Sequence, residues 1–320
     1  MKRLIRVFFS LAFCFLPLMT GAQSASSCCP QNPTKEKQQA LWQKLQDRIA
    51  EVDHRLDGIM GIAIRDLTSG DTYLLHADDV FAQASSIKIT VLAELYRQEQ
   101  RGRLGERNVA RLSDPYTVRS EDMVPDSYIM LGLTPGVTRV TNRDLATMMV
   151  AVSDNSATNV LIDHVGMNNV EQMLASLGLK NTHLRRKMMD LEAARQGREN
   201  VSTPREMMTL LEDIYRNKLF DKDLTTDFFR VLATPKDSSI PKLLPPDVVI
   251  ANKPGELEAV RNDSGIVFVP NRPFVICVMT SYLHDERAGQ GAISEIALAA
   301  YDYFDRLGRS SEYGRAVPAK

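Results

Sequence analysis

The fold is decided by one stretch of this sequence, Phe81-Ala-Gln-Ala-Ser-Ser-Ile-Lys-Ile-Thr-Val-Leu-Ala-Glu-Leu-Tyr96. Small and polar residues lead into an apolar run with helical spacing, which predicts a turn that opens into a helix near Ser85. Ser85 and Lys88 are three residues apart, so they share one face of the first helical turn. The same face continues into the apolar residues Leu92 and Leu95.

This spacing suits an activated serine nucleophile. An ammonium held against apolar side chains is partly desolvated, and desolvation lowers the pKa of a lysine, so Lys88 is a candidate base for Ser85. The free N–H groups of a helix N-terminus can stabilise developing negative charge. The alternative interpretation is structural, with Ser85 as a helix N-cap and Lys88 as a surface lysine. A second Ser-x-x-Lys at 239–242 contains a proline, so the motif alone does not decide.

The first 22 residues have the features of a signal peptide. Lys2, Arg3 and Arg6 precede a short apolar stretch at 7–19, and Thr20-Gly-Ala22 offers small residues for cleavage. The apolar stretch is too short for a comfortable membrane span, and no later run is long enough. We therefore expect an exported protein without a stable membrane span, in the periplasm or secreted.

Composition excludes several classes of protein. The chain has 320 residues, 44% hydrophobic and 25% charged, enough for one large domain or two interleaved lobes. Loss of residues 1–22 removes three positive charges and changes the formal charge from −1 to −4, so a nucleic-acid partner is not expected. The four cysteines do not suggest a disulfide-built fold, and Ala25-Ser-Ser27 before Cys28 lacks the apolar residue of a lipidation site. The five histidines are scattered, so no metal or other cofactor is expected.

Periodicity predicts the first elements. After a polar linker at 23–33, an amphipathic helix is expected over 34–52. Strands at 58–66 and 72–76 around Thr68-Ser-Gly-Asp71 form a predicted hairpin. The Ser85 helix is expected to end near Gly102.

Residues 103–230 are expected to be mostly helical. Helices are predicted from Thr141 to 152, over 155–165 and over 170–177. A charged, irregular stretch at 181–202 is long for a compact domain, which is typical of a functional or mobile loop. Thr203-Pro-Arg-Glu206 predicts a capping box with proline at the first helical position.

Strand patterns return near the C-terminus. Strands are expected at 248–252, 264–269 and 274–282, followed by a closing helix at 292–307 and a flexible tail at 310–320. The predicted fold is α/β (α+β), an antiparallel sheet flanked by helices with an inserted all-α lobe. The α/β lobe would comprise 34–84 and 231–309, and the all-α lobe 85–230. A cleft between the lobes is a natural place for a site.

Two further motifs contain polar residues that could assist a serine nucleophile. Ser153-Asp-Asn155 falls in a polar break between two predicted helices, and Lys253-Pro-Gly255 ends a predicted strand. Each also has a structural interpretation, as a helix cap and as strand-end punctuation. Their order and their placement on helix, turn and strand favour a shared site.

Together the three motifs resemble the class A serine β-lactamase family, within the wider group that includes penicillin-binding DD-peptidases. The resemblance covers about residues 34–309. It extends to Asp144-Leu-Ala and to Val152-Ser-Asp-Asn-Ser-Ala-Thr-Asn159, which are similar to the family's approach to the second motif.

The resemblance implies a set of catalytic roles. Ser85 would attack the carbonyl of a β-lactam or related acyl compound and form an acyl-enzyme. Lys88 would accept or relay its proton, and Ser153 would pass a proton to the leaving nitrogen. Lys253 would bind the substrate carboxylate and adjust the electrostatics around Ser153.

It also implies substrate-binding positions. Asn155 would hold the amide side chain of the substrate. The oxyanion hole would be formed by two backbone N–H groups, those of Ser85 and of Glu256, which follows Gly255. Such preorganised donors suit a tetrahedral intermediate.

The sequence departs from the family in two places. Pro254 replaces the hydroxyl residue that most relatives carry between lysine and glycine, which removes a hydroxyl and a backbone donor and predicts weaker binding of typical penicillins. A proline is tolerated in an edge strand. The second departure concerns the glutamate that positions the deacylating water in class A enzymes: its place falls at Lys187 or Met188, and neither can replace it.

Nearby carboxylates leave two interpretations open. A rearranged loop would offer Glu192 or Glu199, whereas solvated surface positions are the simpler interpretation for these residues and Asp190. The Arg185-Arg186 pair is a candidate to clamp the loop against Glu199.

Three hypotheses follow. The first is an exported, monomeric β-lactam hydrolase with slow deacylation and a small-molecule substrate. The second is a DD-peptidase or esterase with the same nucleophile. The third is a non-catalytic binding protein for cell-wall peptides, against which the retention of all the motif residues argues.

Overall fold

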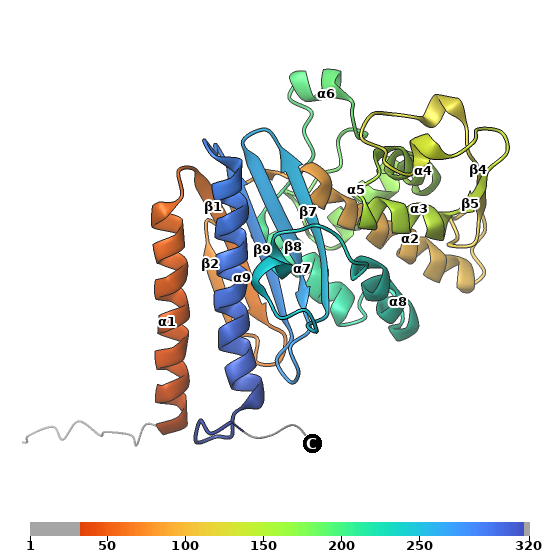
Figure 1. Ribbon diagram of the computed structural model, residues 1–320. Helices are drawn as coiled ribbons and strands as arrows, with labels where there is room; N and C mark the ends of the chain where they lie inside the picture. The colour runs from red at the N-terminus through yellow and green to blue at the C-terminus, as the bar shows by residue number, and fades with distance from the viewer. Residues whose placement is uncertain (1–32, 317–320) are drawn as a thin grey trace, which may run out of the picture.

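The computed structural model describes residues 33–316. The predicted signal peptide, nearly all of the predicted linker and residues 317–320 lie outside this range. The described chain forms an antiparallel sheet flanked by helices, as the sequence predicts (Figure 1). Across residues 33–316, no helix is apolar over a length that would cross a bilayer.

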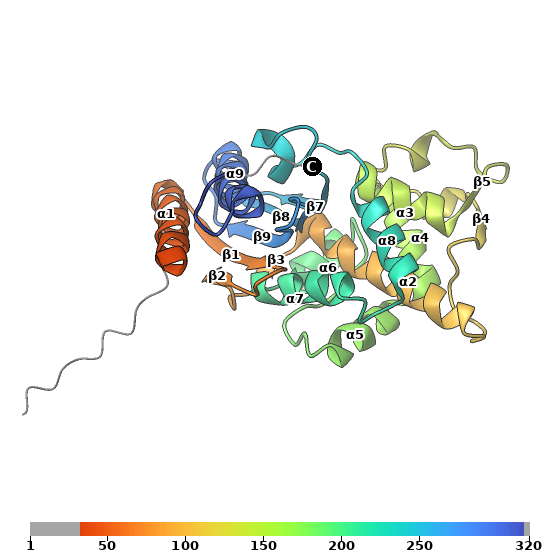
Figure 2. The ribbon, with the colours of Figure 1, turned by 90° about the horizontal axis from the view of Figure 1, so that it is seen from below.

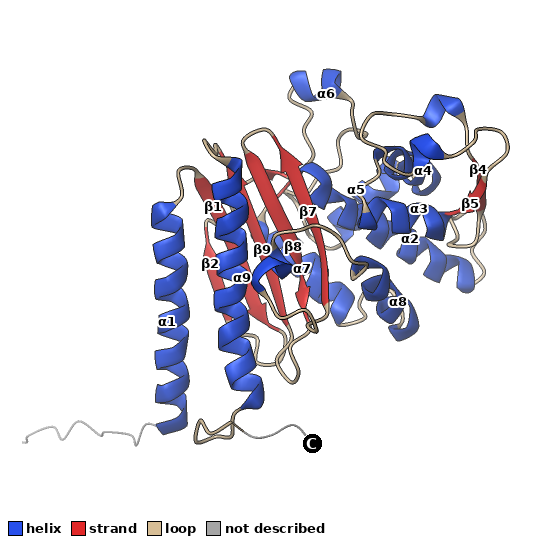
Figure 3. Cartoon of the chain, viewed as in Figure 1, coloured by secondary structure: helices blue, strands red, loops and turns tan. Residues whose placement is uncertain are grey.

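The main sheet has five strands in the order β2-β1-β9-β8-β7, and all its pairings are antiparallel (Figure 3). Its strands are β1 (Ile59–Asp66), β2 (Thr72–Leu75), β7 (Ile250–Leu257), β8 (Val260–Val267) and β9 (Phe274–Ser281). The first and last parts of the chain therefore meet in one sheet, with β1 paired to β9. The predicted β1–β2 hairpin is confirmed.

Helices cover both faces of this sheet (Figure 2). The long terminal helices α1 (Pro33–Arg55) and α9 (Glu286–Arg309) lie on one face, and α7 (Pro204–Tyr215) lies on the other. The sheet separates two hydrophobic cores, one on each face, and strand β9 contributes side chains to both. Phe274, Ile276 and Val278 pack toward α1 and α9, whereas the alternate residues 275, 277 and 279 join the core that contains α7.

Five more helices gather beside the sheet and share one core with its second face (Figure 1). They are α2 (Lys88–Arg103), α3 (Asn142–Ala151), α4 (Asn155–Val165), α5 (Met167–Ser176) and α8 (Lys222–Leu232). The short helix α6 (Leu191–Arg195) is set apart from this group and adds no residue to that core. Helix α2 runs through the middle of this group, and most of its residues are buried. It therefore carries the Ser85 turn at its N-terminus into the region where sheet and helices meet.

Three expectations are corrected. Residues 104–141 are not mostly helical: they contain the short strands β4 (Pro115–Thr117) and β5 (Arg139–Thr141) and two single 3₁₀ turns. The predicted strand at 248–252 does not end at the Lys253-Pro-Gly255 motif, because β7 continues through it to Leu257. Proline fits there because β7 is an edge strand, paired only to β8.

The third correction concerns the predicted capping box at Thr203. Thr203 caps α7 by accepting the N–H of Glu206 at 3.1 Å. The carboxylate of Glu206 instead accepts from the backbone and side chain of Asn181 and from the hydroxyl of Thr182. It thereby ties the start of the 181–202 stretch to α7. That stretch includes α6 and β6 (Val201–Ser202), which pairs with β3 (Phe81–Ala82) just before Ser85.

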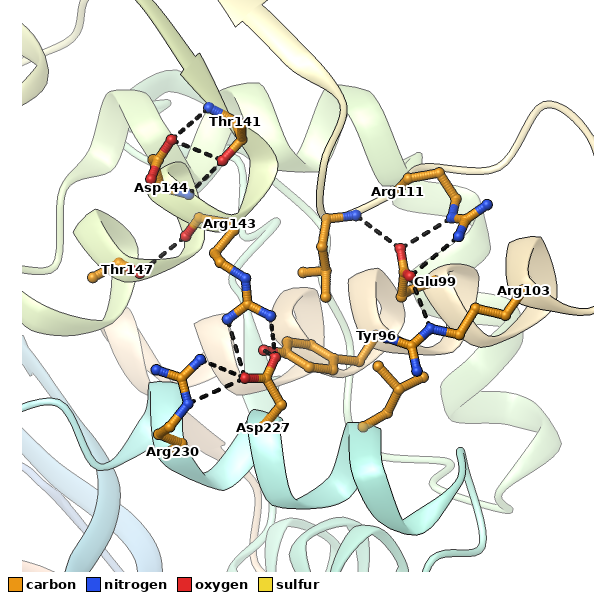
Figure 4. A network of polar contacts seen from close by, with 12 residues as sticks. Tyr96, Glu99, Arg103, Arg111, Thr141, Arg143, Asp144, Thr147, Asp227 and Arg230 are labelled. Carbon is orange, nitrogen blue, oxygen red and sulfur yellow. Dashed lines mark hydrogen bonds and ion pairs between the residues drawn. The ribbon is translucent and has the colours of Figure 1, made fainter.

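A polar network joins three helices on the side away from the sheet (Figure 4). Asp227 on α8 accepts hydrogen bonds from the hydroxyl of Tyr96 on α2 at 2.7 Å, from Arg143 on α3 at 3.1 Å and from Arg230 at 2.5 Å. Burial raises the pKa of Asp227, but the hydrogen bonds from these three residues outweigh it and hold the pKa at about 2.

We expect Asp227→Asn to lower the free energy of unfolding by about 1–3 kcal/mol, because it removes the charge that three donors share. Because the folded pKa lies below the unfolded value, this contribution is present at neutral pH and is lost as the pH falls toward 2. Urea unfolding at pH 7 and pH 3 checks this, and the difference between variant and parent must shrink at pH 3. The matched control is Asp223→Asn, an exposed carboxylate in the first turn of α8, with an expected loss below about 0.5 kcal/mol.

Candidate active site

Ser85 lies on a single 3₁₀ turn, Ala84–Ile87, that leads directly into α2. Ala84 has φ +48, a left-handed conformation that is uncommon for a residue with a side chain. The buried hydroxyl of Ser86 anchors the turn by donating to the backbone oxygen of Gln83 at 2.6 Å. Ser85 itself is half-buried and lines a pocket of the described chain. The predicted turn and helix start are therefore confirmed.

Lys88 is the first residue of α2, and only 1% of it is exposed. Its ammonium nitrogen donates to the backbone oxygen of Ser153 at 2.6 Å, to the Ser153 Oγ at 3.0 Å and to the Asn155 Oδ1 at 2.8 Å. Burial, and then the neighbouring charge of Lys253, lower the pKa of Lys88 well below its ordinary value. Lys88 is therefore a buried amine and not a surface lysine.

Ser153 lies in the turn between α3 and α4 and also has a left-handed backbone, with φ +57. The N-cap of α4 is Asp154, whose Oδ1 accepts from the N–H of Ala157 at 2.9 Å. Since Asp154 is the cap, the hydroxyl of Ser153 is left to face the two lysines. The turn thus aims a hydroxyl and, at Asn155, a carboxamide toward Lys88.

Lys253 approaches the same hydroxyl from the sheet. It is 1% exposed, and its Nζ donates to the Ser153 Oγ at 3.1 Å and to the backbone oxygen of Pro254 at 3.0 Å. Burial, and then the neighbouring charge of Lys236, lower the pKa of Lys253 to about 7. Ser153 is therefore placed between two buried lysines whose pKa values are both lowered.

Gly255 lets strand β7 pass very close to the Ser85 turn. A Cβ at this position would lie 2.5 Å from the backbone oxygen of Gln83 and 2.8 Å from the backbone nitrogen of Ser86. Only glycine allows this approach without a shift of backbone. Glu256, the next residue, has an exposed side chain and lines the pocket with Ser85.

The pocket has a volume of about 680 Å³ and brings the predicted residues together. Its lining contains Ser85, Ser153, Asn155, Lys253 and Glu256, while Lys88 lies just behind it. Its lining also contains residues that sequence patterns did not single out for this site: Asp126, Tyr128, Arg186, Lys236 and Asp237. They come from loops without a recognisable motif, so only the three-dimensional structure finds them.

Lys236 adds a third amine near the site. Its Nζ donates to the backbone oxygen of Leu232 at 2.8 Å, and burial lowers its pKa to about 8. Beneath this end of the pocket lies Asp263, which faces Pro254 across the β7–β8 pair. Asp263 is fully buried, and burial raises its pKa to about 6 despite hydrogen bonds from the backbone of Ile240 and the amide of Asn252.

Of the two positions expected for the family's carboxylate, Lys187 and Met188, only Met188 lies in the pocket. Met188 lines the pocket, and its backbone is held at both ends by the amide of Asn159, at 2.8 Å and 3.1 Å. Lys187 points elsewhere and pairs with Asp163 on α4. Met189, the next residue, also lines the pocket and has φ +63.

The nearby carboxylates take structural positions. Arg186 pairs with Glu199 at 2.7 Å, so one member of the predicted arginine pair clamps the loop, while Arg185 contacts Asn200 through its backbone. Glu192 is exposed and pairs with Arg195 within α6. Asp190 caps α6 by accepting from the N–H of Ala193. Neither Glu192 nor Glu199 lines the pocket. Glu192 and Asp190 are exposed, as the simpler interpretation expects, whereas Glu199 is half-buried against Arg186 and is not a solvated surface residue.

Comparisons with known proteins agree with this geometry. Residues 41–304 match the model of the β-lactamase enzyme family. A β-lactamase of Amycolatopsis lactamdurans is 28% identical over 244 residues, covering 74% of this chain and 77% of that protein. The β-lactamase ROB-1 of Haemophilus influenzae is 27% identical over 270 residues, covering 80% and 83%.

Solved structures show the same fold. A β-lactamase from Sphaerobacter thermophilus superposes with a TM-score of 0.72 at 29% identity, over 82% of this chain and 97% of that one. PBP-A superposes with a TM-score of 0.73 at 24% identity, over 82% and 97%, which supports the fold alone. The chain is therefore a serine hydrolase that belongs to the β-lactamase enzyme family, as a divergent, class A-like member.

Proposed function

We propose that this protein is acylated at Ser85 by β-lactams and releases the acyl group slowly. The observation that carries the proposal is a pair of features of one pocket. Ser85 shares the pocket with Ser153, whose hydroxyl accepts from two buried lysines of lowered pKa, Lys88 and Lys253. Met188 and Met189, and neither Glu192 nor Glu199, line the pocket on the side of the 181–202 stretch. The first supports acylation, and the second leaves water without a base. The two relatives described above are β-lactamases, which supports the choice of substrate.

In this proposal the protons move along the chain of contacts around Ser153. Neutral Lys88 accepts the Ser85 hydroxyl proton while the Ser85 Oγ bonds to the β-lactam carbonyl carbon. As the C–N bond breaks, Ser153 gives its proton to the leaving nitrogen and recovers one from Lys88. Lys253, as an ammonium, binds the substrate carboxylate. The backbone N–H groups of Ser85 and Glu256 stabilise the oxyanion.

Burial is the physical reason why Lys88 can act as a base. As an ammonium it donates to three acceptors, so it is well held while charged. Its lowered pKa makes the neutral form easier to reach than that of a solvated lysine, and loss of one proton allows the Ser153 hydroxyl to donate in the opposite direction. The same contacts therefore serve both protonation states.

The first prediction follows intact mass over time after the mature protein is mixed with a slight excess of benzylpenicillin. We expect an adduct that persists for far longer than it takes to form, and Ser85→Ala should form none. An adduct that appears and then disappears with product would contradict slow release but not acylation. No adduct would overturn the β-lactam proposal and favour the DD-peptidase or esterase alternative, to be assayed with acyl peptides and esters, or the non-catalytic cell-wall peptide-binding protein.

The second prediction concerns the missing carboxylate. We expect Met188→Glu to raise the deacylation rate at least about tenfold, because it places a general base in the pocket. The matched control is Lys187→Glu, whose side chain lies outside the pocket and should leave the rate within about twofold. Decay of the acyl-enzyme mass measures both rates. Equal effects of the two substitutions would contradict the proposal that position 188, and not 187, faces the acyl group.

The third prediction is a pH profile. Because Lys253 must be charged to bind the substrate carboxylate, the second-order rate of acylation should fall as the pH rises through about 7. Lys236→Met removes the neighbouring positive charge, so the pKa of Lys253 rises. The fall in the acylation rate should therefore shift to a pH that is higher by about 0.5–1 unit. Acylation rates at constant ionic strength from pH 5 to pH 9 check the shift. If the rate falls at the same pH in the variant and the parent, Lys253 is not the group that controls it.

Export completes the proposal. We infer that residues 1–22 direct the chain out of the cytoplasm and are removed, that 34–309 form the β-lactamase-like domain, and that 310–320 form a tail. The basic residues before an apolar stretch support this proposal. Export would bring the site to the compartment where cell-wall acyl compounds occur.

A further inference from the structure

The loop at 124–130 forms one end of the pocket and is firmly attached to α4. Ser127 is 1% exposed, its hydroxyl donates to the backbone oxygen of Val124 at 2.7 Å, and it accepts from the N–H of Ser156 at 2.8 Å. The Asp154 Oδ2 accepts from the N–H groups of Ile129 and Met130, each at 2.9 Å. The loop is therefore held in one position next to Asn155.

Two residues of this loop line the pocket and are exposed to solvent. Asp126 and Tyr128 flank the buried Ser127, both are exposed, and both line the pocket. Tyr128 is 76% exposed, which is a large apolar area to leave in water. Asp126 has φ +54, and the N–H of Asn155 donates to its backbone oxygen at 3.4 Å. Within residues 33–316, no hydrogen bond or ion pair engages the carboxylate of Asp126.

Asn155 links the 124–130 loop to the centre of the site. Lys236 and Lys253 line the pocket and supply positive charge, and Lys253 contacts Ser153. Asn155 accepts from Lys88, and its backbone N–H donates to Asp126. Asp126 and Tyr128 therefore lie beside Asn155, the residue proposed to hold the acyl side chain.

A carboxylate and an aromatic ring on one rigid loop are the groups that bind an organic ammonium. The carboxylate supplies charge and accepts N–H bonds, and the ring face attracts a cation. Preorganisation of the loop means that binding would order few side chains. We propose that Asp126 and Tyr128 form a subsite for a positively charged group on the acyl side chain of the substrate. The preferred substrates are then dipolar, with a carboxylate toward Lys253 and an ammonium toward Asp126.

This inference rests on the proposed acylation of Ser85, and three penicillins that share one nucleus test it. Benzylpenicillin is neutral at the side-chain α-carbon, ampicillin carries an ammonium there, and carbenicillin carries a carboxylate. The measured quantity is the second-order rate of Ser85 acylation, followed by intact mass, with benzylpenicillin as the reference in each variant. In Asp126→Asn, the ampicillin-to-benzylpenicillin ratio should fall about threefold to tenfold, and the carbenicillin-to-benzylpenicillin ratio should rise.

Charge reversal and a matched control sharpen the test. Asp126→Lys should favour carbenicillin over ampicillin, and the preferences of the parent protein should shrink when salt is raised from about 10 mM to 500 mM. Asp247→Asn removes the same charge from an exposed position outside the pocket, and both ratios should stay as in the parent. If adducts form but the two rate ratios are the same in the Asp126 variants and the parent, the proposed subsite is overturned and the proposed acylation is not. Absence of adducts with all three penicillins would overturn both the subsite and the proposed function.

Discussion

The structure depends on the burial of one amine. Lys88 is almost completely shielded from water, and a buried charge is tolerated only when hydrogen bonds replace its hydration. Its three acceptors all come from one turn, that of Ser153 and Asn155. The start of α2 and the turn between α3 and α4 must therefore be held together, and Lys253 adds the sheet to this arrangement through Ser153.

The site is also held by residues in uncommon backbone conformations. Ala84 and Ser153, on opposite sides of Lys88, both have positive φ. Conformations of this kind cost about 1–3 kcal/mol each and persist only where the surroundings fix them. Here the surroundings are the anchored hydroxyl of Ser86 and the Asp154 cap. Stability is thus given up locally to aim two hydroxyl groups into one pocket, and the two hydrophobic cores compensate for it.

Sequence patterns predicted the parts of this fold that local spacing controls. The Ser85 turn, the hairpin of β1 and β2, helix α4 and the closing helix follow from periodicity and capping residues, which act over a few positions. The irregular region between α2 and α3 and the continuation of β7 through Pro254 were missed, because they depend on neighbours distant in sequence. The three motifs also predicted which residues meet in the pocket.

The rest of the pocket had no local pattern to reveal it. Lys236 follows a helix end, and Asp126 lies in a loop with ordinary composition. Both matter only because the chain brings them to the pocket that contains Ser85. Met188 is an intermediate case: the sequence pointed to Lys187 or Met188, and only the contacts with Asn159 and Asp163 show that Met188 faces the pocket while Lys187 pairs with α4.

The edge position of β7 has a consequence for molecules much larger than a penicillin. A free strand edge is a template on which an extended peptide can align and form a ladder of backbone hydrogen bonds. In β7 that edge borders the pocket, and Pro254 lies in its middle without an N–H to donate. A peptide that aligned there would lose one rung of the ladder beside the reacting serine. The same proline deters a second copy of the chain from adding its own strand to this edge.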